Sequence, residues 1–364
     1  MSPSYAAHRA QLEALLTAWG MPAGYAARTA EVMSWADLHG IDSHGISMVP
    51  TYHALHKAGR IRMDAQPSIE RETPVSALMD GGGGLGHEPS RQAMEAAIAK
   101  ARAVGIGVVS VHRSAHFGAC GFYAAMAAEA EMIGMVATSA GLVQVAPSGG
   151  AQARLGTDPW AFAAPGRPGE PFLLDMATTT VAAGRIRNKA NEGLPAPPGW
   201  LLTRDGLPST DPLEAAQRGG FLTSLGGTPE GSSHKGYGLA MMVNILGSCL
   251  SGATLVTDPQ HTRGPAGMDI GHFFLALSPA LFRGPGAFEA DVAAFCDAMR
   301  TARPADPAVP VMVAGDPERR AAARRQVEGI PVGAGLLASI RQIAEQSGAP
   351  WLLGDAVPEG YCVR

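Results

Sequence analysis

Two histidines, two aspartates and a serine lie between Trp35 and Gly45, and the stretch ends in Asp42-Ser43-His44-Gly45. Apolar residues at helical spacing flank this polar segment on both sides, so it can hold a titratable side chain over a cleft. The pKa of an unperturbed histidine is about 6.5, which modest burial or a nearby carboxylate can tune for proton transfer by His44. In the alternative interpretation, Asp42 or Ser43 caps the next helix and His44 only lies in its first turn.

A second histidine, His116, lies in Ser114-Ala115-His116-Phe117-Gly118, directly after the strand expected over residues 105–111. The carboxyl end of a strand, just before a helix, is where α/β enzymes place catalytic groups. His112 lies four residues earlier, but no third ligand accompanies the two histidines. The sequence therefore predicts no metal site.

Two further segments could contact a cofactor. Asp175-Met176-Ala177-Thr178-Thr179-Thr180 is expected to open a helical stretch through Ile186, and threonine hydroxyls with free N–H groups at a helix start suit a phosphate. Lys235 precedes an apolar helix expected over residues 239–250, where it could contact phosphate or carboxylate. The alternatives are a simple N-cap for the first segment and an exposed turn lysine for the second.

Gly81, Gly83 and Gly86 match the G-x-G-x-x-G pattern between an expected strand and an expected helix. In a dinucleotide-binding fold the second strand would end in an acid that holds the ribose, but here it ends Val111-His112-Arg113. Four consecutive glycines also satisfy the pattern by chance. A flexible turn with a tight helix start is therefore favoured over a nucleotide site.

Composition excludes several classes of protein. The chain has 364 residues, 46% of them hydrophobic, with a net charge of -4, so no basic surface invites nucleic acid. No apolar run reaches the roughly 18 residues of a membrane span, and no signal-peptide core is visible. Cys120, Cys249, Cys296 and Cys362 form no CxxC pair, which fits a reducing, cytoplasmic compartment and no disulfide framework.

The periodicity of apolar residues predicts an α/β fold. Helices are expected over residues 4–19, 25–39, 49–59, 90–104, 123–132, 239–250, 288–301, 319–326 and 335–347. Strands are expected over residues 74–80, 105–111, 134–138, 161–165, 172–175, 271–277 and 309–313, with 271–277 central. The Pro- and Gly-rich segment 195–212 is expected to be a long ordered loop that covers the site or meets a partner subunit.

Seven short sequence motifs, or words, which are given below in chain order, resemble those of the malate/L-lactate dehydrogenase (type 2) family of NAD(P)-dependent oxidoreductases. That family includes sulfolactate, ureidoglycolate and diketogulonate oxidoreductases and cyclic ketimine reductases. The words are Asp42-Ser43-His44-Gly45, Ser114-Ala115-His116-Phe117-Gly118, Gly156-Thr157-Asp158-Pro159, Leu174-Asp175-Met176-Ala177-Thr178-Thr179, Pro198-Gly199-Trp200, Lys235-Gly236-Tyr237-Gly238-Leu239 and Gly271-His272-Phe273-Phe274.

The resemblance covers most of the chain and implies an α/β fold with a non-Rossmann, mixed-sheet nucleotide-binding domain. It implies a helical domain built from both chain ends, so that residues 1–70 and 306–364 join beside a cofactor-binding domain over residues 71–305. It also implies a homodimer with the active site near the subunit contact, and a small-molecule substrate.

Carried over by position, the resemblance makes His44 the proton donor with Ser43 beside it, and His116 a second histidine that faces substrate and cofactor. It places substrate contacts at Met48, Tyr52 and Thr157. It places cofactor contacts at Asp175, Met176, Ala177, Thr178, Thr179, Lys235, Gly315 and Glu318, and the cofactor is NAD or NADP, with NADPH favoured.

One departure from the family pattern concerns the substrate. Met48 occupies the position where the family usually has an arginine that clamps a substrate carboxylate, and a thioether cannot replace that contact. A cyclic imine or a ketone is therefore expected as the substrate. Two alternatives stay open: a 2-hydroxy-acid dehydrogenase in which Arg113, Arg185 or Arg187 supplies the clamp, and a catalytically inactive protein that binds the cofactor.

Overall fold

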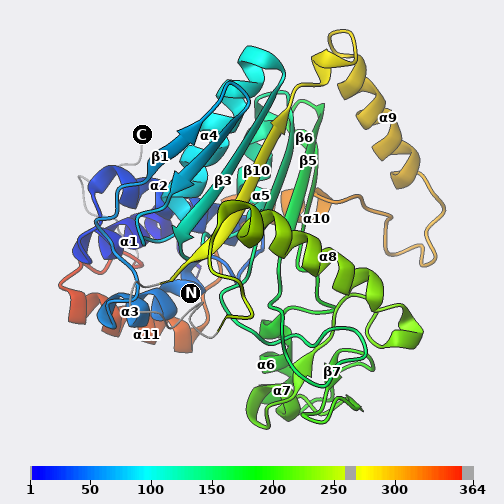
Figure 1. The fold of residues 1–364 in the computed structure, drawn as a ribbon. Coiled ribbons are helices and arrows are strands. Elements are labelled where there is room, and N and C mark those ends of the chain that lie inside the picture. The colour runs from blue at the N-terminus through cyan, green and yellow to red at the C-terminus, as the bar shows by residue number, and fades with distance from the viewer. Residues whose placement is uncertain (1, 259–267, 355–364) are drawn as a thin grey trace.

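The computed structural model describes residues 2–258 and 268–354 (Figure 1). Within these ranges a seven-stranded sheet has the strand order β1-β2-β3-β10-β4-β5-β6. β2 pairs with β3 in parallel, and the other neighbours are antiparallel. The strands are β1 (Ser68–Glu72), β2 (Ser76–Asp80), β3 (Ile106–Ser114), β4 (Ile133–Thr138), β5 (Trp160–Arg167), β6 (Glu170–Met176) and β10 (Ile270–Leu277). The central strand expected over residues 271–277 is confirmed as β10, which lies between β3 and β4.

Helices surround this sheet. They are α1 (Tyr5–Ala18), α2 (Ala23–Leu38), α3 (Val49–Lys57), α4 (His87–Val104), α5 (Cys120–Glu129), α6 (Ala183–Glu192), α7 (Leu213–Gln217), α8 (His234–Asn244), α9 (Ala287–Arg300), α10 (Asp316–Glu328) and α11 (Ala334–Ser347). α8 continues as a π-helical turn over Ile245–Cys249. A 3-10 turn over Ile46–Met48 leads from the loop after α2 into α3.

One hydrophobic core lies between the sheet and helices α4 and α5, which cover the same face of the sheet in Figure 1. Small side chains allow a close approach, because Ala93 and Ala97 of α4 face the sheet. A Cβ added to Gly107 of β3 would lie 2.0 Å from the Ala97 carbonyl oxygen. Phe274 of β10 is fully buried in this core. Burial of such a side chain stabilises the fold by roughly 1.5–3 kcal/mol.

A second core joins the two ends of the described chain. Leu12 of α1, Met33 of α2, Tyr52 of α3 and Ile340 of α11 belong to the same buried cluster. A hydrogen bond of 2.8 Å from the Trp19 indole to the Ser347 hydroxyl closes the contact on its outer side. This packing fixes the directions in which α2 ends and α3 begins, and the loop that carries His44 runs between them.

A smaller sheet, β8-β7-β9, lies beside the main body with α6 and α7 (Figure 1). Its strands are β7 (Leu201–Leu202), β8 (Pro208–Ser209) and β9 (Phe221–Leu222). The segment expected as a loop over residues 195–212 therefore contains two short strands. Its hydrophobic core includes Leu201, Leu222 and Ala240, so α8 packs onto it.

Two expectations about local structure are wrong, and one strand had not been expected. Asp175 and Met176 end strand β6, and the following helix begins only at Ala183. Residues 309–313 form no strand, because Pro310 has no N–H for pairing and the segment meets β6 only through the hydrogen bond from Leu173 to Ala314. Strand β1 was not expected, since all five of its residues are exposed and give no apolar alternation.

Candidate active site

His44 and His116 form the centre of the candidate site. Their rings stack with centroids 5.5 Å apart and an angle of 24° between the planes. The Ser43 hydroxyl lies 2.7 Å from His44 Nδ1, and the Tyr52 hydroxyl lies 2.6 Å from His116 Nδ1. The structure therefore brings together four predicted residues from the loop after α2, from α3 and from the end of β3.

The surroundings of His116 define its tautomer. The backbone N–H of Gly118 points at His116 Nδ1 from 3.4 Å, and an N–H group can only donate. His116 Nδ1 is therefore an acceptor for both Gly118 and the Tyr52 hydroxyl, and in the neutral ring the proton lies on Nε2. Tyr52 is fully buried and its hydroxyl supports His116, and its predicted role as a substrate contact stays a prediction.

Both histidines are neutral at pH 7. Burial lowers the pKa of His44 to about 4. Burial, with the nearby His44, His87 and His272, lowers the pKa of His116 well below its ordinary value. A neutral imidazole can accept a proton, so the free protein holds a base at position 44.

The Asp37 carboxylate holds the loop that carries His44. Asp37 Oδ2 accepts the Ile46 backbone N–H at 2.6 Å and lies 2.8 Å from His8 Nε2. A Cβ added to Gly45 would lie 2.0 Å from this carboxylate, so only glycine lets the loop approach so closely. Asp37 belongs to the polar segment between Trp35 and Gly45, but its structural role follows only from these contacts.

Two buried histidines next to the site were also missed. His272 Nδ1 lies 2.6 Å from the Thr138 hydroxyl, and its Nε2 lies 2.9 Å from the Ser114 hydroxyl. His87 is buried, its ring packs edge-on against Tyr52, and neither of its ring nitrogens has a hydrogen-bond partner within the described residues. The sequence contained a signal for each of them, since His272 belongs to one of the seven words and His87 directly follows the glycine run.

The glycine run is a structural turn that uses its own N–H groups. Gly81, Gly83 and Gly86 donate to the carbonyls of residues 112, 113 and 116 at 2.8, 2.7 and 3.0 Å. A Cβ on Gly86 would lie 2.3 Å from the Ala115 carbonyl oxygen. The turn therefore ties down the backbone of His116, and these N–H groups are not free to cradle a phosphate.

A cavity of about 400 Å³ lies between α2, α5, the β5–β6 hairpin and α10, and neither His44 nor His116 lines it. Gly315 and Glu318, both predicted to contact the cofactor, lie in its wall. Its apolar lining includes Trp35, Pro165 and Leu173. A concave, largely apolar space with a few polar groups is the usual form of a small-molecule site.

Asp175 lies at the first turn of α5, where its carboxylate accepts the Gly121 N–H at 2.7 Å. Burial raises the pKa of Asp175 to about 6, against the lowering effect of that hydrogen bond, and the negative charge of Glu318 adds to the rise. The negative charges of Asp175 and Glu318 therefore repel one another.

The remaining predicted residues are spread around this region. Thr178 donates through its N–H and its hydroxyl to the Thr157 carbonyl, at 2.9 and 3.1 Å, and the Thr179 hydroxyl donates to the Val181 carbonyl. Met176 and Ala177 are partly buried, and Lys235 is exposed in the first turn of α8. These threonine hydroxyls are thus occupied by the chain itself.

Met48 is partly buried against the second core. Arg113 is paired with Asp80 at 2.7 Å. Arg185 and Arg187 are exposed on α6.

Two kinds of feature are absent from the described residues: a group of side chains that could bind a metal ion, and a helix that could cross a membrane. In residues 2–258 and 268–354, no three His, Cys, Asp or Glu side chains converge on a point where an ion could bind. No helix in the same ranges combines the length and the apolar character that a bilayer span requires.

Comparison with known proteins identifies the class. The family model for malate/L-lactate dehydrogenase matches residues 4–341, so the chain belongs to this family of oxidoreductases. It is 36% identical to the malate dehydrogenase of Pyrococcus abyssi over 339 residues, covering 93% of this chain and 92% of the relative. It is 30% identical to the ureidoglycolate dehydrogenase (NAD(+)) of Escherichia coli over 319 residues, covering 86% and 87%. Such relatives imply a nicotinamide cofactor and a small-molecule substrate.

Solved structures agree with this assignment. The malate dehydrogenase of Entamoeba histolytica superimposes with a TM-score of 0.91 at 29% identity, over 96% of this chain and 99% of that one. The Δ1-piperideine-2-carboxylate reductase of Pseudomonas syringae pvar. tomato superimposes with a TM-score of 0.82 at 26% identity, over 94% and 100%. Proteins of this fold are thus named both as dehydrogenases and as a reductase of a cyclic imine.

Proposed function

We propose that the protein is an NAD(P)H-dependent oxidoreductase that reduces a C=O or C=N bond of a small molecule, with His44 as the proton-transfer group. The observation that carries this proposal is the stacked pair of neutral imidazoles His44 and His116, each held at Nδ1 by a hydroxyl. The cofactor, when bound, supplies the hydride. The chain itself binds and orients the substrate and moves the proton.

His44 Nδ1 is engaged by Ser43, so Nε2 is the atom that exchanges a proton with the substrate. In the oxidative direction the neutral ring accepts this proton. In the reductive direction, negative charge that develops on the substrate oxygen or nitrogen favours the protonated ring and draws the proton across. His116 presents an Nε2–H that can hydrogen-bond the same atom. A positioned acid or base of this kind contributes roughly 100- to 10,000-fold in rate.

The shape of the protein between His116 and the cavity fits a dinucleotide. The first turn of α5 follows His116, and Ala128, in its last turn, lines the cavity. Eight residues of helix separate these points, about 12 Å at about 1.5 Å per residue. The residues that would hold the cofactor are His116, Asp175, Met176, Ala177, Thr178, Thr179, Lys235, Gly315 and Glu318. In this proposal the nucleotide lies away from the glycine turn, and its binding domain is not a Rossmann fold.

Met48 supports a substrate without a carboxylate at that position, such as a cyclic imine or a ketone. A buried arginine–carboxylate contact is worth about 1.5–3 kcal/mol or more, and a thioether forms no such contact. The structural similarity to a Δ1-piperideine-2-carboxylate reductase supports reduction of a cyclic C=N bond, although the substrate in that name carries a carboxylate.

A second candidate is a 2-hydroxy-acid dehydrogenase, which the 36% identity to a malate dehydrogenase favours. In that case another cation must hold the carboxylate. A panel of keto acids, ketones and cyclic imines, tested with NADH and NADPH, distinguishes the two candidates. Fastest turnover of oxaloacetate or pyruvate, the keto acids that are reduced to malate and lactate, would contradict the argument from Met48.

The direct test of the mechanism is His44→Ala. We expect a loss of roughly a hundredfold or more in rate, with near-native folding and cofactor affinity. His112→Ala, which removes a histidine paired with Glu70 on β1, is the matched control and should keep its rate. An unchanged rate in His44→Ala would remove His44 from the mechanism.

We also propose a homodimer. Large apolar side chains are exposed on α8 and its continuation at Met241, Ile245 and Leu250, and another, Leu255, in the loop that follows. Exposed apolar side chains that gather on one element are typical of a protein–protein contact. Light scattering on the purified protein tests this directly, and a monomer at all concentrations would contradict it.

A further inference from the structure

The wall of the cavity beside α10 carries an uneven distribution of charge. Arg167 and Arg319 supply the positive charges of the lining. Carboxylates of Glu129, Glu131, Glu289 and Glu318 lie in the same lining. Which of these charges are neutralised by partners decides what the cavity can accept.

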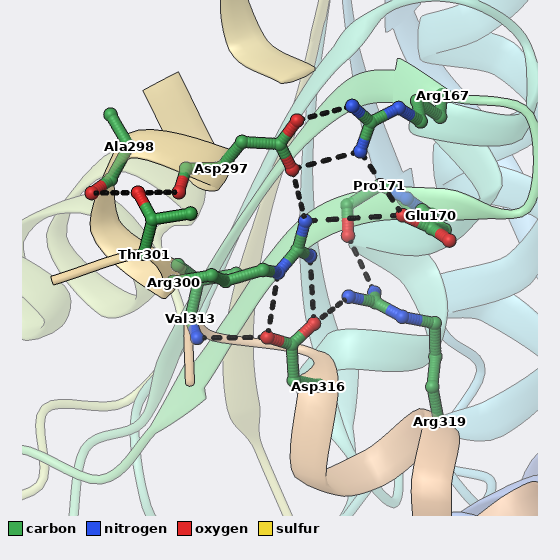
Figure 2. A network of polar contacts seen from close by, with 10 residues as sticks. All are labelled: Arg167, Glu170, Pro171, Asp297, Ala298, Arg300, Thr301, Val313, Asp316 and Arg319. Atoms are coloured by element: carbon green, nitrogen blue, oxygen red, sulfur yellow. Dashed lines mark hydrogen bonds and ion pairs between the residues drawn. The ribbon is translucent and has the colours of Figure 1, made fainter. Parts of the chain in front are cut away.

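Both arginines are already engaged, as Figure 2 shows. Arg167 donates to the Asp297 carboxylate, with Nη1 2.8 Å from Oδ1. Arg319 donates to Asp316 and, at 2.8 Å, to the Pro171 carbonyl. Arg300 completes the network by pairing with Asp297 and Asp316 at 3.2 and 2.8 Å. The positive charges of Arg167 and Arg319 are therefore neutralised by Asp297 and Asp316, which do not line the cavity.

Glu318 differs from these residues. It belongs to none of the ion pairs of this network, although it lies in the first turn of α10 beside Asp316. Its charge acts on Asp175, whose own carboxylate is held only through the Gly121 N–H among its described hydrogen bonds. Asp175 itself does not line the cavity, but Glu129, Glu131, Glu289 and Glu318 do, and none of these four forms an ion pair within the described residues. The cavity wall thus has a surplus of negative charge.

We propose that Glu318 makes this cavity selective for NAD(H) over NADP(H). The inference rests on the proposed function. With His116 before the first turn of α5 and the cavity at the last turn of that helix, Gly315 and Glu318 are taken to hold the adenosine end of the cofactor. A carboxylate accepts a hydrogen bond from a free ribose 2′-hydroxyl, which is how many NAD-dependent enzymes recognise that group. A 2′-phosphate would bring a charge of about -1.5 to -2 to the same place and meet no unpaired cation there. The preference is opposite to the NADPH expected from the sequence.

One feature of the network could weaken this selectivity. The pair between Arg167 and Asp297 is exposed, with side-chain exposures of 49% and 39%. Exposed pairs stabilise by only about 0–1 kcal/mol, so Arg167 is the cation that a phosphate could recruit. Release of Arg167 from Asp297 should therefore raise NADPH affinity.

The experiment is direct binding of NADH and of NADPH by isothermal titration calorimetry, without any substrate. For the wild-type chain we expect NADH to bind at least about tenfold more tightly than NADPH. Glu318→Gln should reduce this ratio by about tenfold. Asp297→Asn should raise NADPH affinity and leave NADH affinity unchanged. Glu328→Gln is the matched control, since it removes the same charge from the exposed end of α10 and should keep the wild-type ratio.

The outcomes separate this inference from the proposed function. Equal or tighter binding of NADPH by the wild-type chain would overturn the inference while leaving the oxidoreductase assignment in place. An unchanged ratio in Glu318→Gln would also overturn it. Failure of both nucleotides to bind would refute the proposed function itself.

Discussion

The guanidinium of Arg325 on α10 forms a salt bridge with the carboxylate of Asp42, two residues before His44. Its Nη2 lies 3.1 Å from Asp42 Oδ2, and its Nη1 donates to both Asp42 and the Asp37 carbonyl oxygen. Arg325 is 8% exposed, whereas the Asp42 side chain is 58% exposed, so the contact is buried on the arginine side alone. Arg325 is thus a positioning residue, which fixes both sides of the loop that presents His44.

Replacement of this arginine should loosen the loop. In Arg325→Met we expect kcat to fall about tenfold or more, and the pKa of His44 to rise from about 4 toward its ordinary value as burial is lost. The acid limb of the pH–rate profile should move to higher pH. Arg324→Met is the control, because Arg324 is exposed and pairs only loosely with Glu328. An Arg325→Met profile that coincides with that of the wild type would contradict the positioning role.

Removal of the Tyr52 hydroxyl should affect His116. Tyr52→Phe keeps the buried ring but leaves His116 Nδ1 with only the distant Gly118 N–H. We expect a loss of about 1 kcal/mol in the free energy of unfolding and about tenfold in kcat, measured by denaturation and steady-state kinetics. Tyr25→Phe, which removes an exposed hydroxyl bound to Gln66, should change neither quantity appreciably. A Tyr52→Phe enzyme with full activity would show that His116 does not need this partner.

The contact between Gly45 and Asp37 predicts a large steric effect. In Gly45→Ala the new Cβ would lie 2.0 Å from the Asp37 carboxylate, so the loop must shift and the Ile46 N–H loses its acceptor. We expect the free energy of unfolding to fall by about 2–4 kcal/mol in urea titrations. Gly238→Ala on α8 meets no atom within 4 Å and should stabilise slightly, by about 0.5–1 kcal/mol. Similar behaviour of the two variants would be inconsistent with the close approach.

Buried histidines should make the protein sensitive to acid. Burial lowers the pKa of His44 to about 4 and those of His87 and His272 to about 3, whereas in the unfolded chain each is about 6.5. The unfolded state therefore binds more protons below pH 6.5, so the stabilising effect of neutral histidines is present above that pH and is lost as pH falls toward 3. The melting temperature should decline over this interval.

His87 allows a specific test of this pH dependence, because it lacks hydrogen-bond partners in the described part of the chain. Its share of the loss is about 2 kcal/mol at pH 5. His87→Leu should therefore show a shallower decline of melting temperature with falling pH than the wild type. His234→Leu, at an exposed position, should decline as the wild type does. Parallel curves for His87→Leu and the wild type would exclude His87 as a contributor.

Apolar periodicity predicted much of the main sheet, because β3, β4 and β10 are buried and rich in branched residues. Apolar periodicity failed where a segment becomes a strand through hydrogen bonds to a neighbouring strand and not through burial of apolar side chains. β1 is exposed and charged, and it becomes a strand only because β2 offers its edge. The alternating valines of residues 309–313 have the pattern of a strand, but no strand within residues 2–258 and 268–354 pairs with them.

The candidate site shows a similar division. His44 and His116 could be selected from the sequence because each lies in a short polar word at the end of an apolar element. Arg325 could not, since it stands beside Arg324 in a helix rich in arginine and only tertiary packing distinguishes the buried one from the exposed one. The charge balance of the cavity likewise depends on ion pairs between segments far apart in the chain.

The salt bridge between Arg325 and Asp42 also joins residues 283 positions apart. During translation, helices α1 to α3 emerge early, but the turn between α2 and α3 must wait for α10 before it is locked in place. The proton-transfer centre is therefore completed only after residue 325 has left the ribosome, so a nascent chain can begin to fold long before it is able to react.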